Sequence, residues 1–192
     1  MKHRSRQVFV ALACAICFAP VQQAGAAEAP ALPNLIELLR PPTDRGDQGF
    51  STTGPSTSRA RPAADEAAAR TTAPEGTAAA ALALPFPSGS ASLTPDAEKI
   101  LEALGRALNS SELSRYRFRI EGHTDTAGEA PANLVLSERR AATVRDHLVN
   151  RHGVAASRLE ASGLGETQLL VQTPDATSEP RNRRVQILNL GG

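Results

Sequence analysis

Two oppositely charged side chains, Asp125 and Arg140, are the strongest candidates for binding chemistry in this sequence. Asp125 follows a segment that alternates like a strand, and Arg140 lies on a predicted helix that begins shortly afterwards. A carboxylate can hold an ammonium group, and a guanidinium can hold a carboxylate in a fork-like pair. The two residues therefore predict a site for a small ligand that carries both charges.

Helical spacing directs a further polar group towards this pair. Asn133 and Arg140 are seven residues apart, which places them nearly in line on one helix face, with Ser137 between them. The loop that carries Thr124 and Asp125 must pass over the start of this helix, where free backbone N–H groups also favour an anion. We therefore expect the acid, the amide and the guanidinium to converge near the helix N-terminus.

The histidine beside this pair does not indicate a metal site. His123 stands two residues before Asp125, but the spacing of the four histidines matches no zinc site. We interpret His123 as a structural residue, and we predict no metal and no cofactor.

Periodicity predicts the elements that would position these residues, from about residue 80 onwards. Strands are expected at 81–86, 115–121, 158–161 and 184–190, and helices from Thr94 and over 132–151. The first helix starts with a hydroxyl cap, a proline and an acid, and Gly153 suits the position that ends the second. This order of elements predicts an α/β (α+β) two-layer sandwich with both helices on one face of the sheet.

The residues before this domain are predicted to be an export signal and a tether. Residues 1–26 combine a basic start, a short apolar run and an Ala-Gly-Ala cleavage site, which is typical of a signal peptide. Both cysteines, Cys14 and Cys17, lie in that segment without a convincing lipid-attachment box, so lipidation is not expected. Residues 27–79 are rich in Ala, Pro, Thr and Ser, which predicts a disordered tether.

One apolar cluster, Leu35–Leu39, interrupts the predicted tether. Two interpretations are open: a short helix that docks on a partner protein, or a transient apolar patch in a tail. We favour the second.

The composition argues against nucleic acid as a partner. The formal net charge is +1, aromatic residues make up 3% of the chain, and there is no tryptophan. Such a chain offers neither a strongly basic surface nor a stacking platform for bases. Nearly all of the positive charge is arginine, which suits bidentate recognition of carboxylates.

Short motifs follow one another through the C-terminal part of the chain. In order, they are Gly122-His123-Thr124-Asp125, Gly128, Asn133, Leu136-Ser137 with Arg140-Ala141, Arg158-Leu159, Gly163-Leu164-Gly165-Glu166 and Asn182-Arg183-Arg184-Val185. The series resembles the OmpA-like domain, the C-terminal module of outer-membrane protein A, which is also found in peptidoglycan-associated lipoproteins and flagellar stator proteins. The resemblance implies a βαβαββ domain with a mixed four-stranded sheet over residues 80–192.

The resemblance also assigns roles to the site residues. The family binds the diaminopimelate residue of peptidoglycan stem peptides non-covalently. By resemblance, Asp125 would take the side-chain ammonium of diaminopimelate and Arg140 its carboxylate. Thr124 and Asn133 would add hydrogen bonds, and Arg183 would line the pocket. Taken singly, the two charges would read as a turn acid and a solvated arginine, and their joint match favours binding.

One departure from the family pattern lies near the end of the chain. The family usually has Gly-Arg a few residues before the position of Asn182, where this chain has Ser178-Glu179. Arg181 is a candidate substitute for the missing arginine, although its register differs.

The sequence therefore predicts a non-enzymatic periplasmic module that binds peptidoglycan and anchors the protein or its partner to the cell wall. Association with the outer membrane or with an envelope protein through Leu35–Leu39 stays open. Two alternatives are an interaction adaptor with a degenerate wall site, suggested by Ser178-Glu179, and a cell-wall hydrolase. The hydrolase is disfavoured because Ser137, inside a helix, lacks an obvious oxyanion hole.

Overall fold

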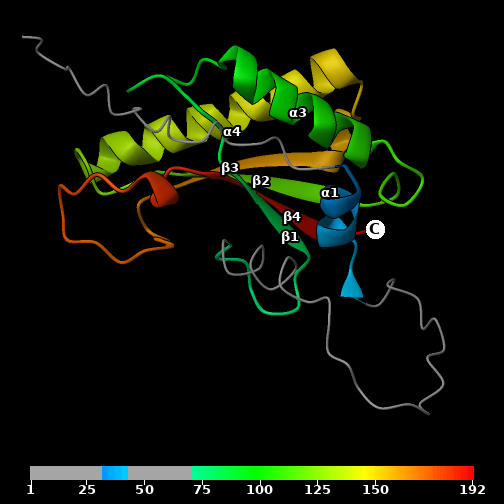
Figure 1. Ribbon diagram of the computed structural model, residues 1–192, viewed down its shortest axis with the longest axis horizontal. Coiled ribbons are helices and arrows are strands. Elements are labelled where there is room, and N and C mark those ends of the chain that lie inside the picture. Colours follow the sequence, from blue (N-terminus) through cyan, green and yellow to red (C-terminus); the bar gives the residue numbers. More distant parts are fainter. Residues whose placement is uncertain (1–31, 43–70) are drawn as a thin grey trace, which may run out of the picture.

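The computed structural model describes residues 32–42 and 71–192, in which helices cover one face of a four-stranded sheet (Figure 1). The elements, in chain order, are α1 (Leu32–Leu39), β1 (Ala79–Leu82), α3 (Pro95–Leu108), β2 (Arg117–His123), α4 (Ala130–His152), β3 (Leu159–Gly165) and β4 (Val185–Gly191). Short 3-10 turns precede β3 and β4. The spatial order is β1-β4-β2-β3, with β2–β3 parallel and both pairs that involve β4 antiparallel. The predicted mixed sheet and two-layer architecture are confirmed.

Local signals in the sequence set the ends of the two long helices. The hydroxyl of Thr94 accepts a hydrogen bond from the backbone N–H of Ala97 at 3.2 Å, and a proline follows it, so α3 starts where predicted. Helix α4 begins at Ala130, two residues earlier than expected, with a proline in its first turn. Gly153 ends α4 with φ 66, the left-handed conformation that a glycine adopts without strain.

The core lies between the sheet and the helices. On β2, Phe118 and Ile120 are fully buried, whereas Arg117 and Arg119 point to the other side and pair with Glu160 of β3. This alternation is the pattern of a strand with one face on the core. The core therefore fixes which side chains β2 presents at its end, where the candidate site begins.

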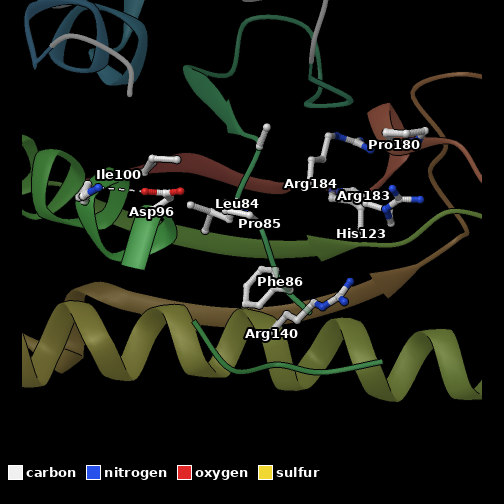
Figure 2. A pocket seen from close by; sticks show the side chains of 12 residues that line it. Leu84, Pro85, Phe86, Asp96, Ile100, His123, Arg140, Pro180, Arg183 and Arg184 are labelled. Carbon is white, nitrogen blue, oxygen red and sulfur yellow. Dashed lines mark hydrogen bonds and ion pairs between the residues drawn. The ribbon is translucent and has the colours of Figure 1, made fainter. Parts of the chain in front are cut away.

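Strand β1 ends earlier than the predicted 81–86. It stops at Leu82, because Pro85 and Pro87 have no backbone N–H to donate to a sheet. The following residues instead leave the sheet and cross towards α4, and Figure 2 shows Pro85 and Phe86 on this crossing segment. The change matters for the candidate site, because it carries the Phe86 ring to the side chain of Arg140.

Helix α1 changes the expected boundary of the domain. The sequence predicted a disordered tether over residues 27–79, yet α1 packs against α3, β1 and β4 and buries Leu35 and Leu39 in the core. Near the end of the same range, Thr72 donates its backbone N–H to the Gln186 side chain. The favoured interpretation of Leu35–Leu39, a transient apolar patch in a tail, is therefore wrong, because the segment is a helix. Leu35 and Leu39 pack on the domain itself and are not free for the alternative, a contact with a partner protein. The rest of the tether, residues 27–31 and 43–70, and the predicted signal peptide lie outside the described residues.

Helix α1 lies at the end of the sheet where β2 starts. The Asn189 side chain donates to the backbone carbonyl of Leu39 at 2.7 Å, and Asn189 pairs with Phe118 near the start of β2. The other end of β2, at His123, leads to the candidate site. Figure 1 shows this separation, with α1 at one end of the sheet and the loops after β2 and β3 at the other.

Close packing between α4 and the sheet depends on two glycines. A side chain at Gly122 would run into the backbone of Ser137, and one at Gly163 would run into the backbone of Glu138. The Ser137 hydroxyl also accepts a hydrogen bond from the Gly165 N–H at 2.8 Å. These contacts hold the first half of α4 directly against the ends of β2 and β3.

The described residues contain neither a membrane-spanning helix nor a cluster of metal ligands. No helix over 32–42 and 71–192 is long and apolar enough to span a membrane. Within the same residues, no group of three or more His, Cys, Asp or Glu side chains is placed to bind a metal ion.

Candidate functional site

A cavity of about 530 Å³ opens where β2 ends and α4 begins. Its walls come from the segment after β1, the loop after β2, the first turns of α4 and the loop before β4. All five residues predicted from the sequence line it: Thr124, Asp125, Asn133, Arg140 and Arg183. The fold therefore brings the predicted site residues to one place.

The Asp125 carboxylate is held by one of its two oxygens. Oδ2 accepts hydrogen bonds from the Arg183 guanidinium at 2.6 Å, the Glu179 backbone N–H at 3.1 Å and the Ser178 hydroxyl at 3.3 Å. Oδ1 forms no hydrogen bond with the described residues. One oxygen thus fixes the carboxylate in place and the other is left for a cation. The residue paired directly with Asp125 is Arg183 and not Arg140.

Arg140 is a buried cation without an ion pair to any described carboxylate. Its side chain is 6% exposed, its Nε donates to the Ser90 carbonyl at 3.0 Å, and its guanidinium lies 4.9 Å from the centre of the Phe86 ring. Burial, and after it the positive charge of Arg183, lower the pKa of Arg140. A buried charge without a partner of opposite sign is costly. The guanidinium is therefore oriented by the protein and would be stabilised by an anion in the cavity.

The loop before β4 is tied to the loop after β2 by Thr126, which the sequence did not single out. The Thr126 hydroxyl donates to the Pro174 carbonyl at 2.7 Å and accepts from the Thr177 N–H at 3.2 Å. Thr177 directly precedes Ser178 and Glu179, which hold the Asp125 carboxylate. The hydrogen bonds of Thr126 therefore help to position these two residues.

The departure at Ser178-Glu179 contributes to the site. The Ser178 hydroxyl lies between Asp125 and Arg183 and accepts from the latter at 2.9 Å. Arg181, considered as a substitute for the family's arginine, instead pairs with the Glu179 carboxylate at 2.9 Å and does not line the cavity. Hydrogen bonds from Arg181 lower the pKa of Glu179 to about 2, so that pair stays charged at neutral pH.

Asn133 and Thr124 play different parts in the cavity. The Asn133 amide nitrogen donates to the Glu166 carboxylate at 2.7 Å and to the Ala127 carbonyl at 3.2 Å, so it holds the loop over the helix. The Thr124 hydroxyl is buried and has no hydrogen-bond partner among the described residues. A ligand in the cavity could supply that partner.

His123, just before the site, is a buried neutral histidine. Burial, and after it the charge of Arg184, lower its pKa to about 3, and the backbone of Gln168 opposes this shift only in part. Neither ring nitrogen has a hydrogen bond of normal geometry with the described residues. The Glu121 carboxylate lies 4.0 Å from Nε2 of this neutral ring. Burial raises the pKa of the Glu121 carboxyl group as well.

Replacing His123 with asparagine should remove part of the acid sensitivity of the fold. The pKa of His123 is about 3 in the folded chain against an ordinary value of 6.5, so below pH 6.5 the unfolded chain binds this proton first. The free energy of unfolding therefore falls by about 1.4 kcal/mol for each pH unit between 6.5 and 3 as the solution is acidified. We expect denaturant titrations to show a shallower loss for His123→Asn over pH 6 to 4. Parallel curves for the two proteins would contradict this account.

Three contributors to the site were not predicted as such. The sequence pattern predicts Phe86 as part of a strand, gives no signal at Thr126, and marks Ser178 only as a departure from the family pattern. The Pro85 and Pro87 pair could have signalled that the chain leaves the sheet at Phe86. The roles of Thr126 and Ser178 depend on partners about fifty residues away, which no local pattern reveals.

Comparison with known proteins identifies relatives of this domain. A model of the OmpA family matches residues 85–183. Outer membrane porin F from Pseudomonas aeruginosa is 46% identical over 67 residues, which are 35% of this chain and 19% of that protein. A peptidoglycan-associated lipoprotein from Mesorhizobium japonicum is 36% identical over 99 residues, 52% of this chain and 57% of that protein. The chain thus spans less than two thirds of the length of either relative.

Two solved structures of similar proteins also align with this chain. The cell wall anchor of the T6SS from Pseudomonas aeruginosa aligns with a TM-score of 0.52 and 29% identity, over 67% of this chain and 94% of that one. A putative MotB-like protein from Desulfovibrio vulgaris aligns with a TM-score of 0.50 and 28% identity, over 60% of this chain and 74% of that one.

Proposed function

The chain belongs to the OmpA family, and from this premise we propose that its domain binds peptidoglycan non-covalently through the side-chain tip of diaminopimelate. That tip carries an ammonium group and a carboxylate on one carbon atom when it is not cross-linked. The cavity offers one group for each. The free oxygen of Asp125 receives the ammonium, and the guanidinium of Arg140 receives the carboxylate.

The observation that carries this proposal is the state of Arg140. Its guanidinium is buried, oriented by Phe86 and Ser90, and has no ion pair with a described carboxylate, although it lines the same cavity as Asp125. A ligand carboxylate would neutralise it, and Arg183 lies close enough to lower the pKa of Arg140 by its charge. A bound anion would therefore also relieve the repulsion between these two arginines.

Anchoring follows from this binding. We place the domain in the periplasm, in keeping with the signal peptide predicted over residues 1–26, and we assign it the attachment of the chain, or of a partner, to the cell wall. The relatives are named as a porin, a lipoprotein and a cell wall anchor, which supports attachment over catalysis. The adaptor alternative loses its main support, because Ser178 and Glu179 help to build the site.

A pair of stem peptides tests the proposal. Titration calorimetry would compare a tetrapeptide that contains diaminopimelate with its lysine counterpart, which keeps the ammonium group and lacks the side-chain carboxylate. We expect the lysine peptide to bind about tenfold to a hundredfold more weakly, since a charge-assisted hydrogen bond is lost. Equal affinities would show that Arg140 does not receive this carboxylate.

A further inference from the structure

A second cavity, of about 630 Å³, lies directly beside the first. The two cavities share Phe86, Arg140 and Arg183 as lining residues. Figure 2 shows Phe86 and Arg140 side by side, with the first turns of α3 to one side of them and Arg183 and Arg184 to the other. A ligand that extends beyond the first cavity can therefore continue past Phe86 into the second.

Part of the lining of the second cavity is apolar. Leu84, Pro85, Phe86 and Ile100 all contribute to it. Such a surface suits the backbone and small alkyl groups of a peptide.

The charged groups around this cavity are mostly positive. Four cations line it, Lys99, Arg140, Arg183 and Arg184, against a single acid, Asp96. Lys99 pairs with Asp96 at 2.9 Å, but the two side chains are 71% and 77% exposed. This ion pair therefore contributes little to the stability of the fold. The Lys99 ammonium group can exchange that partner for a ligand carboxylate at small cost.

At the opposite side of the second cavity, Arg184 keeps its positive charge at neutral pH. Arg184 is 5% exposed, and its guanidinium donates to neutral oxygens of Thr72, Gln168 and Asn182. Burial lowers its pKa to about 10, which leaves it protonated at neutral pH. The nearby His123 stays neutral and adds no charge of its own. The cavity as a whole therefore favours an anion.

We propose that this second cavity binds a second carboxylate of the same stem peptide, with Lys99 as its direct partner. The inference rests on the proposed function, because the two cavities meet at Phe86, Arg140 and Arg183, which puts the second within reach of a peptide held by its diaminopimelate tip in the first. A stem tetrapeptide carries two further carboxylates next to diaminopimelate in sequence: the α-carboxylate of D-glutamate and the C-terminal carboxylate of D-alanine. Both present the same chemistry to an ammonium group.

Amidated peptides distinguish these two sources. The full chain would be titrated with the tetrapeptide L-Ala-D-Glu-diaminopimelate-D-Ala and with two derivatives, one amidated at the D-glutamate α-carboxylate and the other at the C-terminus. We expect one derivative to bind about fivefold more weakly, as is typical for the loss of a partly exposed ion pair, and the derivative that does so identifies the carboxylate.

The Lys99→Gln variant shows whether the second cavity is responsible. It should bind the unmodified peptide about fivefold more weakly than the natural chain and should no longer distinguish the two derivatives. Arg106→Gln is the matched control, because Arg106 also lies on α3 in an exposed pair with an acid, Glu102, and lines neither cavity. It should keep the full difference between derivatives.

Two results would overturn the inference. One is equal binding of all three peptides to the natural chain, and the other is an amidation effect that persists unchanged in Lys99→Gln. In either case the diaminopimelate peptide would still bind more tightly than its lysine counterpart if the proposed function holds. Loss of that preference would instead contradict the proposed function itself.

Discussion

Replacing Arg140 with lysine should weaken binding of the diaminopimelate peptide about tenfold or more, although the positive charge is kept. The guanidinium lies by the Phe86 ring, while its Nε donates to the Ser90 carbonyl at 3.0 Å and one terminal nitrogen to the Pro87 carbonyl at 3.5 Å. These contacts hold the guanidinium in a fixed plane, with its other terminal nitrogen left for a carboxylate. A lysine ammonium has no planar fork and would leave the Ser90 carbonyl without its donor. Replacement with alanine should abolish sedimentation of the chain with purified sacculi.

The neighbouring arginine provides the control for this substitution. Arg139 is exposed on the same turn of α4 and does not line the cavity, so Arg139→Lys should bind as the natural chain does. Circular dichroism would establish that each variant keeps its fold. If Arg140→Lys and Arg140→Ala both sediment with sacculi like the natural chain, the site is elsewhere.

Asp125 should be needed for the same binding, with one further consequence. Asp125→Asn removes the charge that attracts the ligand ammonium and at the same time breaks the ion pair with Arg183. If the two charges hold one zwitterion, Asp125→Asn and Arg140→Lys should each lose binding. Loss in only one of them would mean that the ligand presents a single charge.

Truncating Leu39 to alanine should destabilise the whole domain by about 2–5 kcal/mol. Leu39 is fully buried in the core and comes from α1, a segment whose sequence predicts a tether. A loss of this size is a large part of the stability of a typical domain. Denaturant unfolding of the full chain would measure it, and Leu35→Ala, at an equally buried position, should behave alike.

A partly buried neighbour tests whether burial is the cause. Leu38 packs against the edge of the core, so Leu38→Ala should cost clearly less. A chain that begins at residue 71, without α1, should unfold at a lower denaturant concentration than the full chain. Unchanged stability in Leu39→Ala and in the shortened chain would show that α1 does not belong to the folded core in solution.

Short-range chemistry made much of the fold predictable. The cap at Thr94, the alternation on β2 and the glycine after α4 act within a few residues, and each places an element boundary within about two residues of the structure. The convergence of Asp125 and Arg140 followed from the same logic, since one strand leads directly into one helix.

The remaining features depend on contacts that are distant in the sequence. The partner of Asp125 is Arg183, on a loop without periodicity, and Leu39 is buried because the segment meets β4 about 150 residues later. An isolated apolar cluster has the same composition whether it packs on its own domain or stays exposed. The sequence therefore predicted the residues that gather at the cavity, Arg183 included, but not that Arg183 pairs directly with Asp125.

The position of α1 has a mechanical consequence for the proposed anchoring role. The cavity that would hold the cell wall lies at one end of the sheet, and α1 packs at the other, through Leu39 and Asn189. A load that reaches the domain through α1 therefore crosses the length of the sheet before it reaches the cavity.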